Sequence, residues 1–416
     1  MLVIFFTVRI WSQNPAQIKL GEKLFKDVRF STTKGDLPAS CSTCHMFNED
    51  PQGLRAFADF FNRSWFSYRT ESPQRFMLRN APGLFDLQNY KQFHYDGEFD
   101  SLEALVKGTF SGRPMGWLPG EENEAFAQIQ KVVVNDPDYV AAFKTAYQSD
   151  LKLRSRDEIV KDTARAVADF LRTINSKMNS PYDEFIKLNQ LESQPQPNES
   201  AAQFSARIFE KITILEKEKS LKLSKQFNET ALTGLKIFFN PKQGNCAECH
   251  APPLFTDQKF HNLGISQIEY DQVHGEGKFA ALNIPDAANA LRPTAAFRQY
   301  PTKAKPNEVD LGYWNFANVK TSPMRAANES DNEFLNRMIG AMKTPTLRHL
   351  NFTSPYLHNG AYTSLEATMI ELLRVSEMAR IGKIRAADEK LKTIYLQETD
   401  IVPLVSFLNS LTENLK

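Results

Sequence analysis

Two copies of one short motif hold every cysteine of the chain. The first copy is Cys41-Ser-Thr-Cys44-His45 and the second is Cys246-Ala-Glu-Cys249-His250. In a Cys-x-x-Cys-His motif the two thiols add to the two vinyl groups of a haem, and the histidine binds the iron. A redox dithiol, a four-cysteine zinc site or a disulfide pair would leave both histidines without a role. The motifs therefore predict two covalently bound c-type haems, with His45 and His250 as iron ligands.

The composition limits the other classes of function. A chain of 416 residues is longer than one usual domain, so two domains are expected. Hydrophobic residues make up 42% and charged residues 24%, which excludes a disordered or collagen-like chain. The formal net charge of +1 offers no overall attraction for nucleic acid. No apolar run reaches the length of about 20 residues that a transmembrane helix needs.

The first residues bear on the compartment. Residues 2–8 form a short apolar run, which is either a signal-peptide remnant over residues 1–13 or a wrongly assigned start. Haem c attachment usually follows export across the bacterial inner membrane. We therefore expect an exported, periplasmic protein.

The sequence around the two motifs indicates an internal duplication. An apolar periodic segment precedes each motif, Leu20–Phe25 in the first half and Leu232–Phe239 in the second. Further on, an Asp-Gly or Asn-Gly turn is followed by Ser-Leu-Glu-Ala, which opens a capped helix in each half. This alignment sets Tyr95 opposite His358. It also matches Leu78-Arg-Asn80 with Leu347-Arg-His349.

The expected fold is mainly α, with two cytochrome-c-like helical lobes. The N-terminal lobe covers residues 14–190 and the C-terminal lobe covers residues 227–416. Residues 191–226 are expected to form a linker with a helical insert. A long insert with irregular loops is expected at about residues 264–341, where the sequence lacks periodicity.

The arrangement resembles the bacterial di-haem cytochrome c peroxidases and their MauG-type relatives. Besides the haem motifs, four groups of segments carry the resemblance: 136–143, 163–170, 252–262 and 343–358. The resemblance implies two haem lobes with one calcium ion between them. Its calcium ligands would be the side chain of Asn80 and the backbone carbonyls of Thr353 and Pro355, hard oxygen donors of the kind that calcium prefers.

The chain departs from this family at the peroxide site. Family peroxidases have a glutamate some twenty residues after an aromatic residue that lies between the haems. Tyr95 takes the aromatic position, where tryptophan is usual, but the segment Gly112–Trp117 contains no glutamate. Such a carboxylate moves a proton between the two peroxide oxygens. Arg113, Glu121 and Glu122 are the candidates to replace it, and the sequence does not choose among them.

The iron ligands on the far side of each haem also differ. The family supplies a methionine or tyrosine to the second haem from the helix after the His-x-Gly turn, but the matching residue here is Leu372. Other candidates are Met369, Met378, Met324, Met338 and His274. No histidine occurs between His45 and His94, where only Met46 and Met77 are soft donors. A five-coordinate first haem is therefore expected.

The resemblance implies a periplasmic di-haem peroxidase. Hydrogen peroxide would react at the N-terminal haem, and electrons would arrive through the C-terminal haem from a small cytochrome c or cupredoxin. Two alternatives stay open: a MauG-type enzyme that oxidises side chains of a partner protein, and an electron carrier with two six-coordinate haems. The chain is expected to act as a monomer or homodimer.

Overall fold

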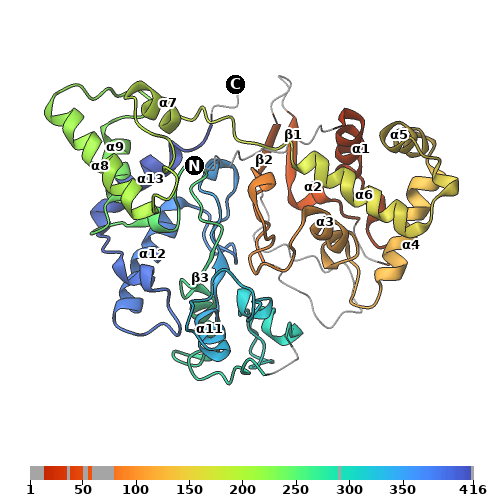
Figure 1. The fold of residues 1–416 in the computed structure, drawn as a ribbon. Coiled ribbons are helices and arrows are strands. Elements are labelled where there is room, and N and C mark those ends of the chain that lie inside the picture. Colours follow the sequence, from red (N-terminus) through yellow and green to blue (C-terminus); the bar gives the residue numbers. More distant parts are fainter. Residues whose placement is uncertain (1–13, 35–37, 50–54, 59–78, 289–291, 414–416) are drawn as a thin grey trace.

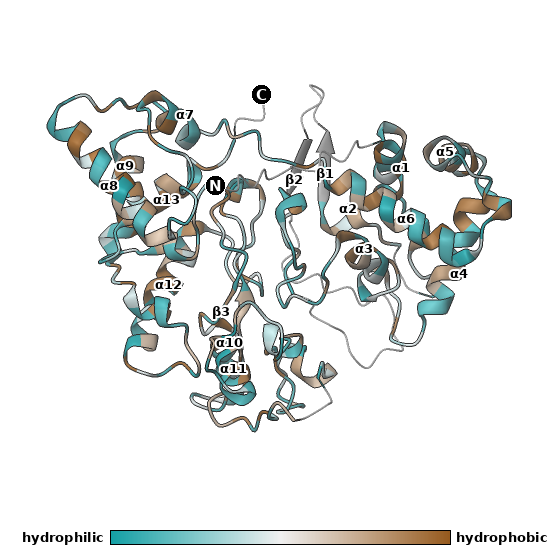
Figure 2. Cartoon of the chain, in the orientation of Figure 1, coloured by the Kyte–Doolittle hydropathy of each residue, from teal (hydrophilic) through white to brown (hydrophobic). Residues whose placement is uncertain are grey.

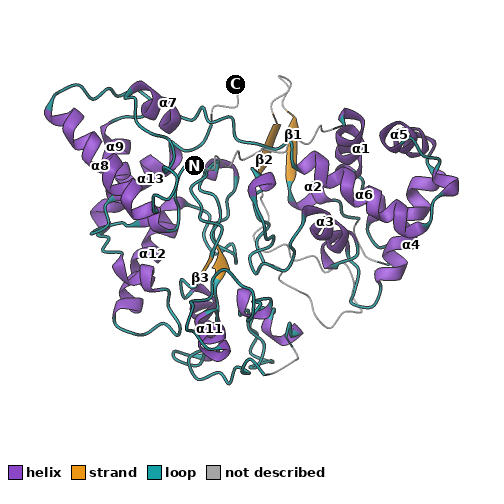
Figure 3. Ribbon diagram, in the orientation of Figure 1, coloured by secondary structure: helices purple, strands orange, loops and turns teal. Residues whose placement is uncertain are grey.

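The computed structural model describes residues 14–34, 38–49, 55–58, 79–288 and 292–413 (Figure 1). The expectations for residues 1–13, Leu78 and Met77 lie outside these ranges, as does the side chain of Met46. Over the described residues the chain forms 13 α-helices, several short 3-10 helices and four short strands (Figure 3). The expectation of a mainly α protein is confirmed.

The N-terminal lobe is built around a crossing of its first and last helices. Its helices are α1 (Pro15–Lys26), α2 (Cys41–Cys44), α3 (Leu102–Phe110), α4 (Glu122–Asn135), α5 (Pro137–Tyr147) and α6 (Arg156–Leu171). Helices α1 and α6 cross at Gly21, where an added Cβ would lie 1.9 Å from the carbonyl oxygen of Ala166. Only glycine permits this approach. Leu24, Phe25 and Phe170 are buried beside it.

The C-terminal lobe repeats this crossing. Its helices are α9 (Glu229–Phe239), α12 (Leu365–Arg380) and α13 (Ile401–Asn409), and α8 (Ala201–Lys217) packs on them. Helix α7 (Pro181–Leu188) lies in the stretch expected to belong to the N-terminal lobe, but its apolar residues are buried in the C-terminal core. An added Cβ at Gly234 of α9 would lie 1.9 Å from the carbonyl oxygen of Pro403 in α13. Helix α8, from the segment between the lobes, buries Phe204, Ile208 and Ile212 in the core of this lobe. Figure 2 shows apolar and polar residues alternating along these helices.

The insert of the C-terminal lobe has a core of its own. Helices α10 (Ile265–His274) and α11 (Asp331–Arg337) lie within it. Strands β3 (Phe260–His261) and β4 (Met342–Lys343) border it and pair antiparallel. Tyr313, Trp314 and Phe334 are fully buried in its core. The other two strands, β1 (Met46–Glu49) and β2 (Arg55–Ala58), pair antiparallel directly after the first haem motif.

The backbone confirms that Tyr95 and His358 are equivalent positions. Each lies one residue after a left-handed residue, His94 at φ 63° and Leu357 at φ 68°. Each is also followed two residues later by a left-handed glycine. Isolated bridges join Phe93 to Phe99 and Tyr356 to Tyr362, closing the same turn in both halves. Ser101 and Ser364 then cap α3 and α12 by accepting hydrogen bonds from Ala104 N and Ala367 N.

The expected match of Asn80 with His349 is wrong. Asn80 N–H donates to the carbonyl of His358 at 2.8 Å, and Lys343 N–H donates to the carbonyl of Tyr95 at 2.8 Å. The two hydrogen bonds run in opposite directions between the repeats. Asn80 and Lys343 therefore hold equivalent positions in the two repeats. His349 instead matches Asp86, because both residues are left-handed, with φ of 62° and 61°. The tripeptide Leu-Arg-x occurs in both repeats but at different positions, so matching the two copies aligned residues that are not equivalent.

Within the described ranges, the structure has no helix of the length and apolarity needed to cross a membrane.

Candidate haem sites and the cavity between the lobes

A cavity of about 810 Å³ opens beside the first haem motif. Cys41, Cys44 and His45 line it from the N-terminal lobe, and His358 lines it from the C-terminal lobe. Cavities of about 300–1,000 Å³ are typical of ligand and cofactor sites. The cavity therefore has the size and the donor set for a covalently attached haem at His45.

The cysteines of both motifs are free thiols. In each motif they start a short helical turn, α2 in the first and a 3-10 turn over Cys246–Glu248 in the second. Burial raises the pKa of Cys41 and of Cys246 to about 12.

His250 is oriented as an iron ligand. Its Nδ1 lies 2.9 Å from the backbone carbonyl of Phe255, so Nδ1–H donates there and Nε2 is left to bind a metal. Burial lowers the pKa of His250, which favours the neutral form that coordinates. Both motifs fit the c-type haems that the sequence predicts.

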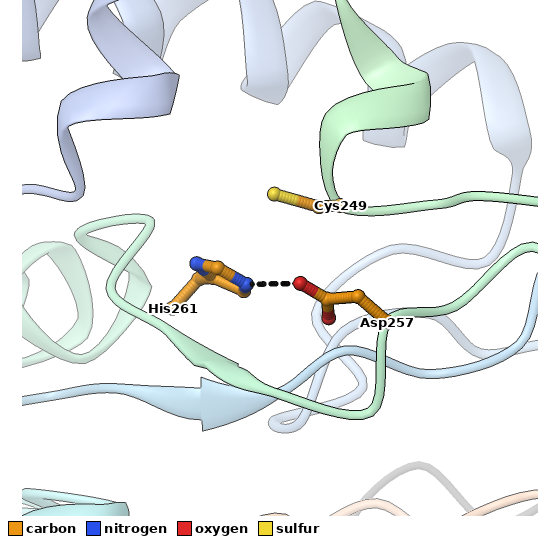
Figure 4. A group of neighbouring side chains, drawn as sticks. All are labelled: Cys249, Asp257 and His261. Atoms are coloured by element: carbon orange, nitrogen blue, oxygen red, sulfur yellow. Dashed lines mark hydrogen bonds and ion pairs between the residues drawn. The ribbon is translucent and has the colours of Figure 1, made fainter. Parts of the chain in front are cut away.

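A charged cluster lies beside the second motif (Figure 4). His261 Nε2 is 2.9 Å from a carboxylate oxygen of Asp257, and Nδ1 is 2.7 Å from one of Asp388. Burial alone would lower the pKa of His261, but the two carboxylates raise it to about 11. The thiol of Cys249 lies within the same group. The imidazolium of His261, held by two carboxylates, therefore lies next to Cys249, where the second haem would be attached.

Two arginines meet on one wall of the cavity. Arg113, in a 3-10 turn over Arg113–Met115, lines the cavity from the N-terminal lobe, and Arg298 lines it from the insert. Burial lowers the pKa of Arg113, and the positive charge of Arg298 lowers it further. The structure thus places Arg113 where the sequence predicts it. It also adds Arg298, which the sequence did not single out.

Arg298 is held by carboxylates of the turn that carries Tyr95. Its guanidinium donates to Glu98 at 2.6 Å and to Asp96 at 3.1 Å. Glu98 also lies 3.0 Å from His94 Nδ1. Burial alone would raise the pKa of Glu98, but hydrogen bonds with His94 and Arg298 lower it. The sequence predicted a long irregular insert here, but its lack of periodicity gave no sign of which residue would reach the N-terminal lobe.

The two glutamate candidates lie in different surroundings. Glu122 lines the cavity, and its carboxylate accepts a hydrogen bond from Gly120 N at 3.1 Å. Glu121 is absent from the described lining of the cavity. Its carboxylate accepts from Leu118 N at 2.9 Å and pairs with Lys34 at 3.2 Å. Of the two, Glu122 is the better placed to exchange protons with a molecule in the cavity.

Tyr95 lies where the two lobes meet. Its ring faces that of His358, with 6.3 Å between ring centroids and 65° between ring planes. Both residues line the cavity. Equivalent residues of the two repeats are thus in edge-to-face contact, which brings an aromatic side chain from each lobe to the same point.

The three expected calcium ligands line the same cavity. Asn80 Nδ2 donates to the carbonyl of Pro355 at 2.6 Å and lies 3.3 Å from that of Leu357. Its Oδ1 is buried without a hydrogen-bond partner among the described residues. A buried oxygen without a partner costs about 1–3 kcal/mol, and a cation would remove that cost. With its amide turned so that Oδ1 faces the Pro355 carbonyl, Asn80 would offer a calcium ion an oxygen beside the carbonyls of Thr353 and Pro355.

The candidate ligands for the far side of the second haem are spread over several cores. Met369 and Leu372 pack in the C-terminal lobe, and Met338 is buried in the core of the insert, with Met324 packed against it. Met378 packs near α10, and the ring of His274 lies against that of Tyr270. The second haem therefore keeps His250 as the ligand that the geometry identifies.

The comparisons with known proteins agree with this geometry. The family described as di-haem cytochrome c peroxidase matches residues 15–191. Over this stretch, which is less than half of its length, the chain is similar to the di-haem cytochrome c peroxidase family. Cytochrome-c peroxidase IdrP2 of Denitromonas iodatirespirans is 26% identical over 353 residues, which cover 85% of this chain and 72% of that protein. The methylamine utilization protein MauG of Methylorubrum extorquens is 24% identical over 397 residues, 95% of this chain and 78% of that protein.

Solved structures share the fold. The diheme peroxidase BthA from Burkholderia thailandensis is 18% identical and aligns over 98% of this chain and 88% of its own, with a TM-score of 0.61. A MauG-like protein associated with microbial copper homeostasis is 20% identical and aligns over 96% and 90%, with a TM-score of 0.56. These values show the fold of the di-haem peroxidases across nearly the whole chain.

Proposed function

We propose that this protein is a periplasmic peroxidase that reduces hydrogen peroxide at its N-terminal haem site. The observation that carries the proposal is the cavity at His45, which has the size for a haem and is lined by Arg113 and Arg298. A bound haem would supply the iron that takes up peroxide and exchanges electrons with it. Overall, one peroxide accepts two electrons and two protons, its O–O bond breaks, and two waters leave.

The residues of the chain would guide the charges and protons of this reaction. Arg113 and Arg298 present positive charge to the breaking O–O bond, which stabilises the negative charge that develops on the leaving oxygen. Glu122 is the carboxylate of the cavity that the sequence had proposed as an acid or base. Tyr95 and His358, one from each lobe, are in ring contact and would lie on the path by which electrons from the second haem arrive.

We also propose a calcium ion at Asn80, Thr353 and Pro355. Asn80 belongs to the N-terminal lobe, whereas Thr353 and Pro355 belong to the C-terminal lobe. An ion bound there would therefore hold the two lobes in one arrangement, and with it the contact between Tyr95 and His358. The partnerless Oδ1 of Asn80 is the observation that supports it.

The proposed activity is tested with the holoprotein and a reduced ferrocene derivative as artificial donor. Two donors should be oxidised per peroxide added, and a reduced small cytochrome c or cupredoxin should also serve. Failure to oxidise any donor in the presence of peroxide would contradict the proposal.

A second candidate is a MauG-type enzyme that oxidises side chains of a partner protein. The specific support is the segment Gly112–Trp117, which lines the cavity without a carboxylate. The two functions separate when peroxide is added without donor. A MauG-type enzyme should hold its oxidised state until a protein substrate is supplied, whereas a peroxidase should be restored by the small donor.

A further inference from the structure

Asn80 and Lys343 join the two repeats through hydrogen bonds. Each residue begins the same short sequence, with a proline two residues later and a leucine four residues later. Each also donates its backbone N–H, at 2.8 Å, to the carbonyl of the central residue of the other repeat, His358 or Tyr95. These two bonds are related by the internal two-fold symmetry of the duplication.

The side chains of these residues continue the symmetry. Asn80 Nδ2 donates to the carbonyl of Pro355, three residues before His358, at 2.6 Å. Lys343 Nζ donates to the carbonyl of Gln92, three residues before Tyr95, at 2.9 Å. The Lys343 ammonium therefore occupies, in the loop of the N-terminal lobe, the place that corresponds to the proposed calcium site in the loop of the C-terminal lobe.

The Asn80 side would take up a cation, whereas the Lys343 side supplies one. Asn80 offers a partnerless oxygen that a cation would satisfy. Lys343 brings its own positive charge, 4.6 Å from the ring centroid of Tyr90 and 5.8 Å from that of Phe93. Contacts of this kind attract a cation to the face of an aromatic ring. Burial lowers the pKa of Lys343 to about 7, and the nearby Asp96 carboxylate opposes this shift, so the side chain carries its positive charge below about pH 7.

A lysine at such a half-buried position usually extends its ammonium into water. Lys343 Nζ instead points to a backbone carbonyl and two rings of the loop that carries Tyr95. The contact fixes residues 92–95 from the side of the C-terminal lobe, by both the backbone and the side chain of one residue.

We propose that Lys343 is a built-in cation that replaces a second metal ion between the lobes and positions Tyr95 against His358. The comparison with calcium rests on the proposed function, whereas the contacts of Lys343 do not depend on it. Lys343 is a positioning residue, since it acts on the Tyr95 loop and is not placed at the reacting atoms.

The first test measures electron exchange between the haems in half-reduced holoprotein, prepared with a dye and without peroxide. Lys343→Met should slow the exchange by roughly ten- to a hundredfold, since misplacement by about 1 Å can cost a factor of that size. Cyanide binding at the N-terminal haem should stay at the wild-type level, and Lys343→Arg should recover part of the rate. The matched control is Lys383→Met, at an exposed lysine paired with Glu276. A wild-type exchange rate in Lys343→Met would overturn the positioning role.

The second test asks whether the position accepts a metal. Lys343→Asn copies the Asn80 side, so after equilibration with calcium this variant should hold one more calcium ion than the wild type. Added calcium should also raise its melting temperature and its exchange rate. An unchanged calcium content would overturn the replacement of a metal by Lys343. If Lys343→Met does not fold, the calcium response of Lys343→Asn decides the positioning role as well.

The two proposals fail in different ways. Absence of calcium from the wild type would contradict the proposed calcium site but leave the exchange measurement on Lys343→Met valid. Absence of any reaction with peroxide would contradict the proposed activity, and the exchange measurement uses no peroxide.

Discussion

The two haem motifs sit in the same scaffold but in different surroundings. In both lobes a glycine allows the first and last helices to cross, and a left-handed residue precedes the residue that faces the other lobe. The first motif borders a cavity walled by Arg113 and Arg298. In the second lobe, the family position for an iron ligand is filled by Leu372, which packs against two apolar cores. The duplication therefore explains the fold, and the loops around it explain the different roles.

The largest contributor to this difference is a loop from the other lobe. Arg298 comes from the insert of the C-terminal lobe yet lines the cavity of the N-terminal one. Beside the second motif lies the imidazole of His261, which is paired with Asp257 and Asp388.

Loss of a cysteine should have the largest effect, and each variant should affect the haem of one lobe only. Cys44→Ala should remove or weaken covalent attachment of the first haem only, and Cys249→Ala that of the second only. Intact mass should show two haems in the wild type. A wild-type mass with one haem or none, from a host able to attach haem c, would contradict the assignment of both motifs.

Replacing Arg113 tests the open site. Arg113→Ala should slow the reaction with peroxide by roughly ten- to a thousandfold, because a positive charge near the breaking O–O bond is removed. Arg113→Lys should keep part of the rate, and both haems should stay attached. Stopped-flow absorbance of the haem bands is the measurement. The matched control is Arg165→Ala on α6, a half-exposed arginine near Asp169. Equal rates in Arg113→Ala and the control would remove Arg113 from the mechanism.

Removing calcium tests whether an ion at Asn80 holds the two lobes together. Chelation, or the variant Asn80→Ala, should lower the melting temperature and slow electron exchange between the haems. A ligand present at 100–1,000 times its dissociation constant stabilises the folded state by about 3–4 kcal/mol. Elemental analysis should find one calcium per chain in the wild type. No metal, and a melting temperature that chelator does not change, would count against this site.

The smallest expected effect concerns His349, the residue that matches Asp86. Its side chain is 0% exposed, its ring stacks on Phe85 with 3.9 Å between ring centroids, and its Nε2 lies 3.0 Å from Ser176 Oγ. The Ser176 hydroxyl donates to Asp86, so His349 Nε2–H donates to Ser176, and Nδ1 carries no proton. Burial lowers the pKa of His349 to about 3, and the charge of Arg348 adds to this.

This depressed pKa has a defined effect on stability. Between pH 6.5 and about 3 the unfolded chain binds a proton at this histidine that the folded chain does not bind. The free energy of unfolding should therefore fall as the pH falls through this range, by up to about 1.4 kcal/mol per pH unit. His349→Gln should lose less stability than the wild type between pH 6 and pH 4 in thermal or denaturant unfolding. Parallel curves for the two proteins would show that His349 does not titrate in this way.

Much of the fold follows from local signals. The haem motifs, the Ser-Leu-Glu-Ala caps and the Asp-Gly and Asn-Gly turns are short and specific, and they predicted the duplication and the equivalence of Tyr95 and His358. The contact between the two rings was found only in the structure. The equivalent of Asn80 in the second repeat was harder to predict. The tripeptide that Asn80 shares with His349 suggested one match, whereas the proline and leucine spacing that it shares with Lys343 indicated the correct one. Hydrogen bonds between distant segments were needed to correct it.

The candidate site divides in the same way. Arg113 and Glu122 lie within a segment that the family resemblance points to, and both line the cavity. Glu121 has the same charge and is adjacent in sequence, but it lies before the first turn of α4, where its carboxylate is used by Leu118 N and Lys34. Arg298 could not be predicted, because its position depends on how a long insert folds back onto the other lobe.

We propose that the N-terminal haem is open to peroxide and that the C-terminal haem is not the peroxide site. The most direct measurement is the electronic spectrum of the oxidised, as-isolated protein, followed by stopped-flow addition of one equivalent of peroxide. The account predicts high-spin features from one haem, which change on addition of peroxide or cyanide and are lost in Cys44→Ala. A low-spin spectrum for both haems, unchanged by peroxide and by cyanide, would contradict the account and favour an electron carrier.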